Sequence, residues 1–172
     1  KPSELTPTTA TLLADVIDKL DVPKGVFNLL HGYGTECGSV LTSDPAVQGV
    51  SFTGGTATGR IVAASAAPLF KKMSLELGGK NSSIVFADCA FEETVSGVTR
   101  AAFLNQGQIC LCGSRILVER SIYAAFVAAV VERMKTMKIG DPEAPDSDLG
   151  ALISLAHREK VEGFIQSAKE EG

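Results

Sequence analysis

The sequence predicts an α/β protein with helices on both faces of a parallel sheet, built as two domains. The first observation is an alternation along the chain: short apolar runs rich in β-branched residues are separated by longer segments with helical periodicity. That alternation is typical of βαβ units. The second observation is the pair Gly78-Gly79, which directly follows a predicted strand. Two flexible residues let the chain leave one sheet for another, so we expect the domain boundary there.

In the first half, a helix is predicted over about 9–20, with Thr6 or Thr8 placed to cap its start. Residues 71–77 alternate between apolar and polar, which predicts a half-buried strand with Glu76 on the face opposite its leucines. Between these two elements the sequence predicts a buried strand at 26–30, a short helix at about 35–42, a strand at 49–53 and a helix at about 57–66.

The second half continues the alternation. It predicts a buried strand at 83–86, a helix at 91–103, a strand at 114–118, and helices at about 121–137 and 155–170. A loop rich in Pro and Asp separates the last two helices. The helix at 57–66 and its extension carry more apolar surface than one sheet-facing stripe requires, which favours a subunit contact there.

Composition excludes several classes of function. The 172 residues are 45% hydrophobic and 21% charged, the balance of an ordinary globular protein. The formal charge of −4 arises from 16 basic and 20 acidic residues spread along the chain, so nucleic acid and membranes are not expected partners. No apolar run approaches the roughly 18 to 20 residues of a membrane helix, and residues 1–4 are not a signal peptide. We therefore expect a cytoplasmic protein, and the abrupt ends suggest a piece of a longer polypeptide.

Four cysteines, at positions 37, 89, 110 and 112, are too few and too irregularly spaced for a disulfide framework. No metal site is expected either. Cys110-x-Cys112 lacks the two-residue spacer of structural zinc pairs, and the two histidines, His31 and His157, are far apart. Each thiol is therefore either a nucleophile or a packed side chain without a chemical role. For an average intracellular cysteine the packing role is the more common one.

Two glycine-rich turns are candidate phosphate sites. Residues 32–38 follow a predicted strand and open a helix with GxGxxxG spacing, which fits a pyrophosphate turn and a plain βα turn about equally. Residues 52–59 form a second such turn, whose amides and Thr56 hydroxyl make an anion nest. It has no P-loop lysine, so NTP hydrolysis is disfavoured.

The stretch Asn-Gln-Gly-Gln-Ile-Cys at 105–110 suits a tight backbone turn beside a thiol. Main-chain N–H groups in such a turn can activate a thiol and later hold an oxyanion. On an extended segment Cys112 would point to the same face as Cys110 but further along, which favours a packing role for it. Glu76, taken alone, is better interpreted as an exposed strand residue or a partner of Lys80 than as a catalytic group.

Four stretches, in this order, resemble the aldehyde dehydrogenase superfamily: KPSE at 1–4, SFTGGTATG at 51–59, LELGGKN at 75–81 and NQGQIC at 105–110. The resemblance runs the whole chain. It implies that residues 1–78 are the second half of an atypical Rossmann-like, NAD-binding domain, and that residues 79–172 are the first part of a catalytic domain. It also implies a homodimer or homotetramer.

The resemblance implies NAD as the cofactor, held at the chain start and around the glycine-rich turns. Glu4 would accept hydrogen bonds from the adenosine ribose and repel a 2′-phosphate, so NAD is expected over NADP. Gly55 stands where a serine is more usual, which puts one phosphate hydrogen bond in doubt. The implied cofactor-binding residues are Lys1, Glu4, Gly34, Gly54, Gly55, Thr56 and Gly78.

The implied catalytic residues are Cys110 and Glu76. Cys110 would attack an aldehyde, hydride would pass to the nicotinamide, and water deprotonated by Glu76 would hydrolyse the thioester to a carboxylate. An oxyanion-hole asparagine and a glutamate for the nicotinamide ribose are expected outside these residues, so the 172 residues alone are not expected to turn over.

Two rival functions stay open. An acylating aldehyde dehydrogenase would pass the thioester to coenzyme A, and Glu76 argues against it. A catalytically silent relative would keep the fold for assembly, and the presence of both Cys110 and Glu76 argues against that. The stretches GQICLCGSR, ERSIY and LGALIS most resemble the 2-aminomuconic and 2-hydroxymuconic semialdehyde dehydrogenases, so a semialdehyde is the expected substrate. Betaine aldehyde and aliphatic aldehyde enzymes also remain open.

Overall fold

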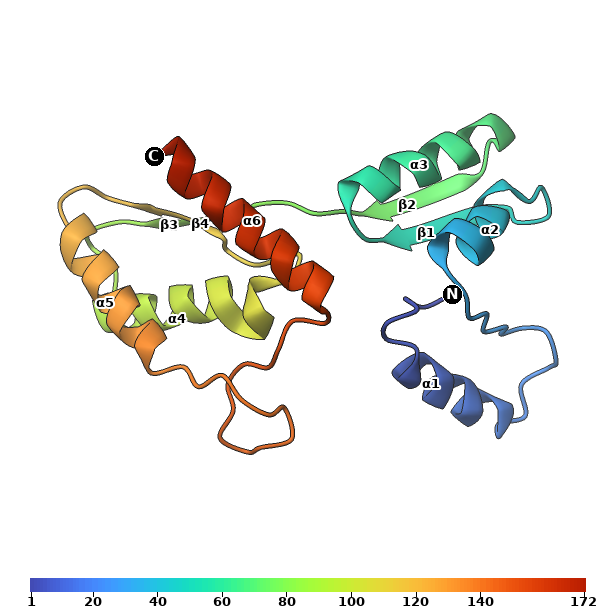
Figure 1. Ribbon diagram of the computed structural model, residues 1–172, viewed down its shortest axis with the longest axis horizontal. Helices are drawn as coiled ribbons and strands as arrows, with labels where there is room; N and C mark the ends of the chain where they lie inside the picture. The colour runs from blue at the N-terminus through green and yellow to red at the C-terminus, as the bar shows by residue number, and fades with distance from the viewer. The chain divides into compact units, whose positions relative to one another are not determined.

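The computed structural model describes residues 1–172, which form two compact units, Lys1–Gly78 and Gly79–Gly172. Both units mix helices with one small sheet of two parallel strands (Figure 1). The predicted α/β class is confirmed at this level. No helix in the chain combines the length and apolar character needed to cross a membrane.

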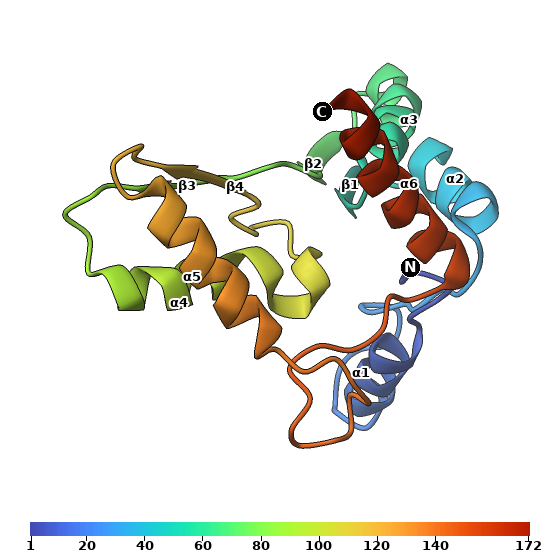
Figure 2. The ribbon, with the colours of Figure 1, turned by 60° about the vertical axis from the view of Figure 1, so that its left-hand side comes forward.

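The first unit is built around a β-α-β connection. Because parallel strands cannot be joined by a tight turn, a helix carries the chain from one to the other. Figures 1 and 2 both show this helix lying along the strand pair. The elements are α1 (Thr8–Asp18), the π-helical turn η1 (Gly34–Gly38), α2 (Ser39–Ser43), β1 (Gly49–Thr53), α3 (Thr56–Ala66), the 3₁₀ turn η2 (Ala67–Leu69) and β2 (Lys72–Glu76).

The helix α3 packs through small and β-branched side chains. Val62 and Ala66 are buried, and Gly59 has no Cβ at the point where the side chain of Leu77 packs closely against it. Ile61 points elsewhere and is 70% exposed. The strand register pairs Gly49 with Lys72, Val50 with Met73, Ser51 with Ser74, Phe52 with Leu75 and Thr53 with Glu76.

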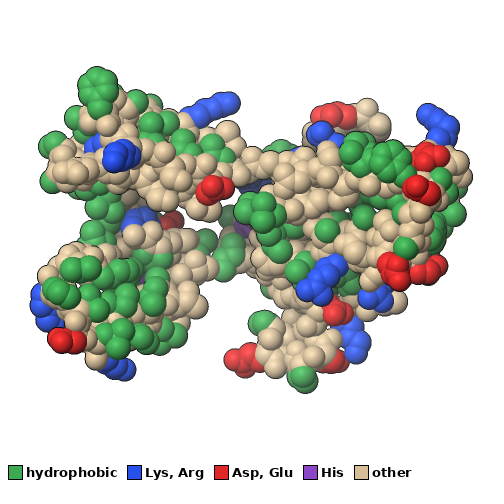
Figure 3. All heavy atoms as spheres, turned by 180° about the vertical axis from the view of Figure 1, so that it is seen from behind, with side chains coloured by type: hydrophobic (Ala, Val, Ile, Leu, Met, Phe, Trp, Pro, Cys, Tyr) green, Lys and Arg blue, Asp and Glu red, His purple; other side chains and the backbone are tan.

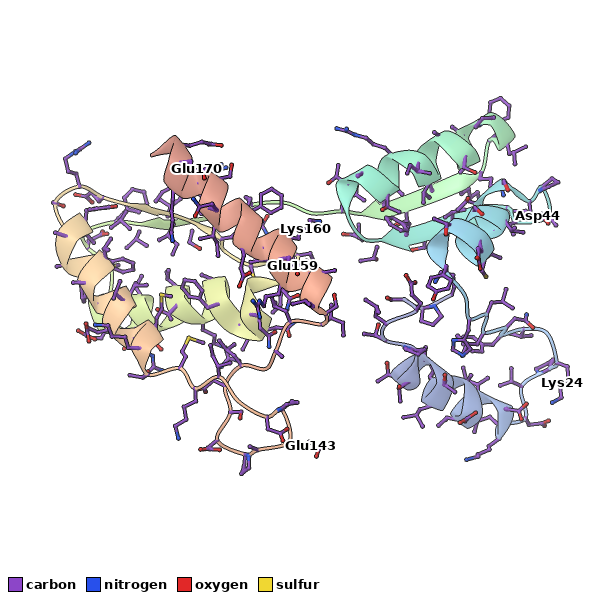
Figure 4. All side chains as sticks on the ribbon, in the orientation of Figure 1. Lys24, Asp44, Glu143, Glu159, Lys160 and Glu170 are labelled. Carbon is purple, nitrogen blue, oxygen red and sulfur yellow. The ribbon has the colours of Figure 1, made fainter.

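A buried lysine joins α2 to the start of β2. Lys71 is only 7% exposed, and its Nζ donates to the carbonyl oxygen of Asp44 at 2.5 Å. Figure 4 labels Asp44 at the end of α2. The four-carbon stem of Lys71 is thus covered by protein, and its ammonium group has a hydrogen-bond acceptor. A buried lysine needs such an acceptor because an unpaired buried charge is costly.

Two predictions for the first unit are wrong. Residues 26–30 form no strand, because no backbone hydrogen bond joins them to β1 or β2, and Val26 is 70% exposed. Apolar, β-branched composition is a strand signal only where a neighbouring strand completes the ladder. Neither predicted threonine caps α1. The helix follows Pro7, whose carbonyl accepts from the Thr11 hydroxyl at 3.0 Å.

The α1 region leaves its apolar stripe uncovered within the first unit. Leu12, Leu13 and Val16 are each more than half exposed. Figure 3 shows hydrophobic side chains gathered on the surface of this region.

The second unit also pairs two parallel strands, with Ser82 opposite Arg115 and Val85 opposite Val118. Figures 1 and 2 show two of its helices side by side below the strand pair. The elements are β3 (Ser82–Val85), α4 (Phe91–Phe103), the 3₁₀ turn η3 (Leu104–Gly107), β4 (Arg115–Val118), α5 (Tyr123–Lys135) and α6 (Leu155–Glu171).

The core of the second unit lies where β3, α4 and α5 meet. The rings of Phe91 and Phe126 pack edge to face, with centroids 5.7 Å apart, a favoured aromatic geometry. The buried cluster comprises Val85, Val95, Val98, Phe126 and Val130.

The strand predicted as buried at 83–86 is buried on one face only. Val85 joins the core, whereas Ile84 and Phe86 are more than 60% exposed. Alternation places Ile84 on the face opposite Val85, and the core helices pack against the Val85 face. The loop between α5 and α6 forms as predicted and carries Glu143 at its tip, away from α4 (Figure 4).

Candidate active site

The segment before Cys110 turns through three consecutive residues with left-handed backbone. Asn105, Gln106 and Gly107 have φ of 51°, 57° and 70°. Glycine adopts this conformation freely, whereas an L side chain such as that of Gln106 does so at a cost of roughly 1–2 kcal/mol. The N–H of Gln108 closes the turn on the Asn105 carbonyl at 3.1 Å. The chain therefore turns sharply after helix α4 and enters the loop that bears the thiol.

The two neighbouring cysteines face different surroundings. Cys110 is exposed, whereas Cys112 is buried, with 5% of its surface accessible. The expectation that both point to the same face is wrong because the segment is not extended: the Cys112 N–H donates to the Ile109 carbonyl at 2.9 Å, which makes a turn. The burial of Cys112 agrees with the packing role predicted for it.

The backbone of Cys110 is held on one side only. Its carbonyl oxygen accepts a hydrogen bond from Nδ2 of Asn81 at 3.0 Å. Its N–H donates to no acceptor in the protein. An exposed thiol beside an unpaired N–H is an arrangement that can bind an electrophilic carbonyl and stabilise the oxyanion formed on it.

The hydrogen bond from Asn81 to Cys110 is a contact of the candidate site that the sequence did not predict. Asn81 closes the stretch LELGGKN, which contributed to the resemblance, but nothing local indicated what its amide contacts. The available signal was indirect. Asn81 lies two residues before the strand predicted at 83–86, and the cysteine loop lies just before the strand predicted at 114–118. Parallel pairing of these two strands brings both lead-in segments to the same edge of the sheet.

Glu76 is the last residue of β2, and its carboxylate is exposed. It forms no ion pair, and Nζ of Lys80 donates instead to the Gly79 carbonyl at 3.3 Å. The main-chain carbonyl of Glu76 accepts the N–H of Gly54 at 3.0 Å. The structure therefore brings Glu76 and the second glycine-rich turn together, through the backbone.

That turn is open at the start of α3. Gly54 lies against the ring of Phe52, which stands 2.6 Å from where a Cβ would be. Gly55 precedes the helix in extended conformation, and no atom lies within 4 Å of the place that a Cβ would take there. No side chain caps the helix, so the N–H groups of its first turn, from Thr56 on, remain available to an anion.

Lys1 and Glu4 are also brought together. Their charged groups lie 3.6 Å apart, and Nζ of Lys1 donates to the Gly32 carbonyl at 2.7 Å. Glu4 lines a pocket of about 240 Å³ with Thr11 and His31. Gly34 opens η1, and Gly78 follows β2, each with no atom near its missing Cβ.

One carboxylate has a clearly shifted pKa. Glu119, just after β4, accepts from the Ala87 N–H and the Ser121 hydroxyl, each at 2.8 Å. These two hydrogen bonds, the first more than the second, lower the pKa of Glu119 below its ordinary value of 4.5. Glu119 joins the far end of the β3–β4 pair to the loop after β3.

The predicted catalytic pair is divided between the units: Glu76 belongs to the first, and Cys110 to the second. The predicted cofactor residues all belong to the first unit. Nowhere in the chain do three or more His, Cys, Asp or Glu side chains gather as a metal-binding group.

The chain is similar along its whole length to proteins of known sequence and structure. The aldehyde dehydrogenase family matches residues 1–172. The chain is 46% identical to a 2-aminomuconic 6-semialdehyde dehydrogenase of Pseudomonas sp., over 100% of this chain and 35% of the relative. It is 48% identical to the 2-aminomuconic semialdehyde dehydrogenase of Danio rerio and 47% identical to the 2-hydroxymuconic semialdehyde dehydrogenase of Pseudomonas putida.

Solved structures give the same result. A betaine aldehyde dehydrogenase from Staphylococcus aureus, crystallised with NAD+, superposes with a TM-score of 0.97 at 40% identity, covering 99% of this chain and 34% of that one. The chain thus spans about a third of the length of the proteins that it matches. With a match that extends from its first residue to its last, the chain belongs to the aldehyde dehydrogenase family.

Proposed function

We propose that this chain carries the nucleophile and the general base of an NAD-dependent aldehyde dehydrogenase that oxidises a semialdehyde to a carboxylate. The observation that carries the proposal is the pairing of an exposed Cys110 thiol with an unpaired Cys110 N–H, in a member of this family. All experiments use the full-length enzyme, a protein of the relatives' length that contains these 172 residues.

The first unit is proposed as the second half of a Rossmann-like NAD-binding domain, and the second unit as the first part of the catalytic domain. The open start of α3 supports the first assignment, because unpaired N–H groups at a helix N-terminus suit a pyrophosphate. The Cys110 loop supports the second.

The residues of the first unit fit NAD. The Glu4 carboxylate at its pocket suits ribose hydroxyls, with Lys1 alongside, and the adenosine would lie near Gly34. The turn at Gly54, Gly55 and Thr56 would take the phosphates. The space at Gly55 leaves room for a phosphate to approach the backbone closely. When bound, NAD supplies the hydride acceptor.

Cys110 does the covalent chemistry in this proposal. Its thiolate adds to the aldehyde carbon, forming a C–S bond while the carbonyl electron pair moves onto oxygen. The Cys110 N–H, which has no protein partner, donates to that oxyanion. Loss of hydride from the same carbon leaves a thioester on Cys110.

Glu76 completes the turnover. Its carboxylate takes a proton from water, the hydroxide adds to the thioester carbonyl, and the C–S bond breaks to release a carboxylic acid and the thiolate. An exposed carboxylate with no ion pair is free to act as this base. Release to coenzyme A would not need it, which favours hydrolysis over the acylating alternative.

The semialdehyde assignment rests on the relatives. Proteins with 46–48% identity over the whole chain are named for 2-aminomuconic or 2-hydroxymuconic semialdehyde. A 4-trimethylaminobutyraldehyde dehydrogenase of Danio rerio is 46% identical, so identity alone does not separate the substrates. A panel of semialdehydes, betaine aldehyde and aliphatic aldehydes given to the full-length enzyme decides among them by kcat/KM.

Replacing Glu76 by Gln in the full-length enzyme tests the mechanism. Glutamine keeps the size of the side chain but cannot take a proton, so hydrolysis of the thioester should slow by roughly 10²–10⁴-fold. Hydride transfer precedes that step. Rapid mixing with aldehyde and NAD should therefore give a burst of about one NADH per site and then a slow steady state, with the acyl mass on a Cys110 peptide.

The matched control is Glu143→Gln, an exposed carboxylate on the loop between α5 and α6 with no role in the proposal, which should leave both phases unchanged. A steady-state rate near that of the wild type would eliminate Glu76 as the base. If coenzyme A rather than water released the acyl group, added coenzyme A would raise the wild-type rate, and the acylating alternative would replace this proposal.

A further inference from the structure

We propose that Asn81 is a positioning residue for Cys110, and that its amide fixes the backbone of the nucleophile's loop. This inference rests on the proposed function, in which Cys110 is the nucleophile. Nδ2 of Asn81 donates to the Cys110 carbonyl oxygen at 3.0 Å, an ordinary length for this bond. The two residues are 29 positions apart, so the bond ties the loop to a separate segment of the chain.

Asn81 holds the loop at two points. Besides the side-chain bond to Cys110, its main-chain carbonyl accepts the N–H of Arg115 at 3.0 Å. Arg115 is also the first residue of β4 and pairs with Ser82 in β3. The segment from Cys110 to Arg115 is therefore closed at both ends on the residue that precedes β3.

The side-chain bond acts on the reacting residue and leaves its reacting groups free. Asn81 engages the Cys110 carbonyl, which the proposed chemistry does not use. The thiol is exposed, and the N–H of Cys110 has no protein acceptor. A donor at the carbonyl fixes the peptide group after Cys110. It thereby restricts the directions in which the Cys110 thiol and the Cys110 N–H can point.

The loop needs such a restraint because the turn before it is strained. Asn105 and Gln106 hold left-handed conformations, which persist only where surrounding contacts enforce them. Downstream, the Gly113 N–H donates to the Ala101 carbonyl at 3.1 Å. Between these points Cys110 is exposed, and Asn81 makes the one side-chain hydrogen bond to it.

The experiment compares Asn81→Asp with Asn81→Gln. Aspartate keeps the shape of asparagine but has no donor and repels the Cys110 carbonyl, whereas glutamine keeps the amide donor. The matched control is Asn28→Asp, which removes the same kind of bond, from Nδ2 to the Gly25 carbonyl at 2.8 Å, in the first unit. Two quantities are measured in the full-length enzyme: amide hydrogen exchange of a peptide spanning 109–112, and kcat and KM for the aldehyde.

In Asn81→Asp, exchange in 109–112 should quicken by about tenfold as the loop opens more often. The value of kcat should fall by about 10–100-fold with KM little changed, because a small misplacement of a nucleophile costs rate more than binding. Asn81→Gln should recover a large part of both quantities, and Asn28→Asp should alter neither.

Unchanged exchange and unchanged kcat in Asn81→Asp would overturn the positioning role while leaving the proposed function standing. A wild-type enzyme that oxidises no aldehyde would overturn the proposed function, and the exchange result would still decide whether Asn81 orders the loop. If Asn81→Asp fails to fold, Asn81→Gln is compared with Asn81→Ala, which lacks the amide donor. Wild-type exchange and kcat in Asn81→Gln would support the role of the donor. Losses in Asn81→Gln as large as those in Asn81→Ala would refute it.

Discussion

The turn at residues 54–56 and the loop at 105–113 both contain two glycines, yet they are stabilised differently. The first extends a strand ladder, since the Gly54 N–H reaches the carbonyl of Glu76 directly after the β1–β2 pairing. The second leaves a helix through left-handed residues and is held by the Asn81 amide and the Ala101 carbonyl.

This difference explains what each region can do. A turn that continues a ladder needs no further side chains, so the N–H groups that follow Gly54, at the start of α3, remain open toward a ligand. A loop that must present one thiol in one direction needs contacts from outside itself, and some of those contacts offset backbone strain. We therefore expect substitutions at the loop to alter chemistry and stability together, and substitutions at the turn to alter ligand binding.

Removing the thiol is the largest expected effect and tests the loop side of the comparison. In the full-length enzyme, Cys110→Ala should abolish both NADH formation and acyl labelling, because the covalent adduct cannot form. The control is Cys112→Ala, two residues away, which removes a buried thiol and should lower thermal stability while keeping turnover. Steady-state kinetics and peptide mass spectrometry measure both, and residual acyl labelling of Cys110→Ala would assign the chemistry to another residue.

The same contrast explains which features could be predicted from sequence. The β1–α3–β2 unit was predicted within one or two residues, because its periodicity and its glycine turn are local signals. The helix at 91–103 was predicted with the bounds that α4 has. Residues 26–30 were not, since a strand depends on a neighbour that the local sequence does not specify.

The candidate site could be predicted in identity but not in geometry. Four motif stretches pointed to Cys110 and Glu76 as a pair, and the family match supports that interpretation without testing either role. The opposite exposures of Cys110 and Cys112, and the Asn81 contact, depend on a turn and on strand pairing across 29 residues. Such contacts are decided by tertiary structure, which no local pattern encodes.

The close approach at Gly113 gives the next largest effect. A Cβ there would overlap Oγ of Ser83, whereas the Cβ of Ser83 lies 3.6 Å from it. Gly113→Ala should destabilise the full-length enzyme by about 1–3 kcal/mol, and Ser83→Ala in the same chain should restore much of that loss. Thermal or urea unfolding measures the cycle. The control Gly97→Ala, inside α4 with no atom within 4 Å, should be neutral or stabilising; additive losses at 113 and 83 would contradict the steric explanation.

Strain at Gln106 should appear as a smaller effect of opposite sign. Glycine relieves the left-handed cost of roughly 1–2 kcal/mol but adds roughly 0.4–1 kcal/mol of unfolded-state entropy, so Gln106→Gly should stabilise by up to about 1 kcal/mol. The same substitution at Gln166, in the helix α6, should destabilise by about 1 kcal/mol. Urea unfolding of both variants measures the pair. Destabilisation by both would mean that the loop backbone is not strained.

The smallest effect concerns Glu119, which ties the opposite end of the β3–β4 pair from Asn81. Its pKa is lowered in the folded chain by the Ala87 N–H first and the Ser121 hydroxyl second, so its charged form stabilises the fold. That contribution is complete above the unfolded value of 4.5 and is lost as pH falls through the lower folded value. Glu119→Gln should therefore lower Tm at neutral pH, with the difference from wild type shrinking as pH falls below 4.5.

Glu143→Gln, on the exposed loop between α5 and α6, should show no such pH-dependent difference (Figure 4). A Glu119→Gln difference that stays constant from neutral to acidic pH would show that the two hydrogen bonds do not depend on the charge. In that case the Glu119 side chain would still tie this end of the β3–β4 pair through its two hydrogen bonds, but its negative charge would add nothing to them.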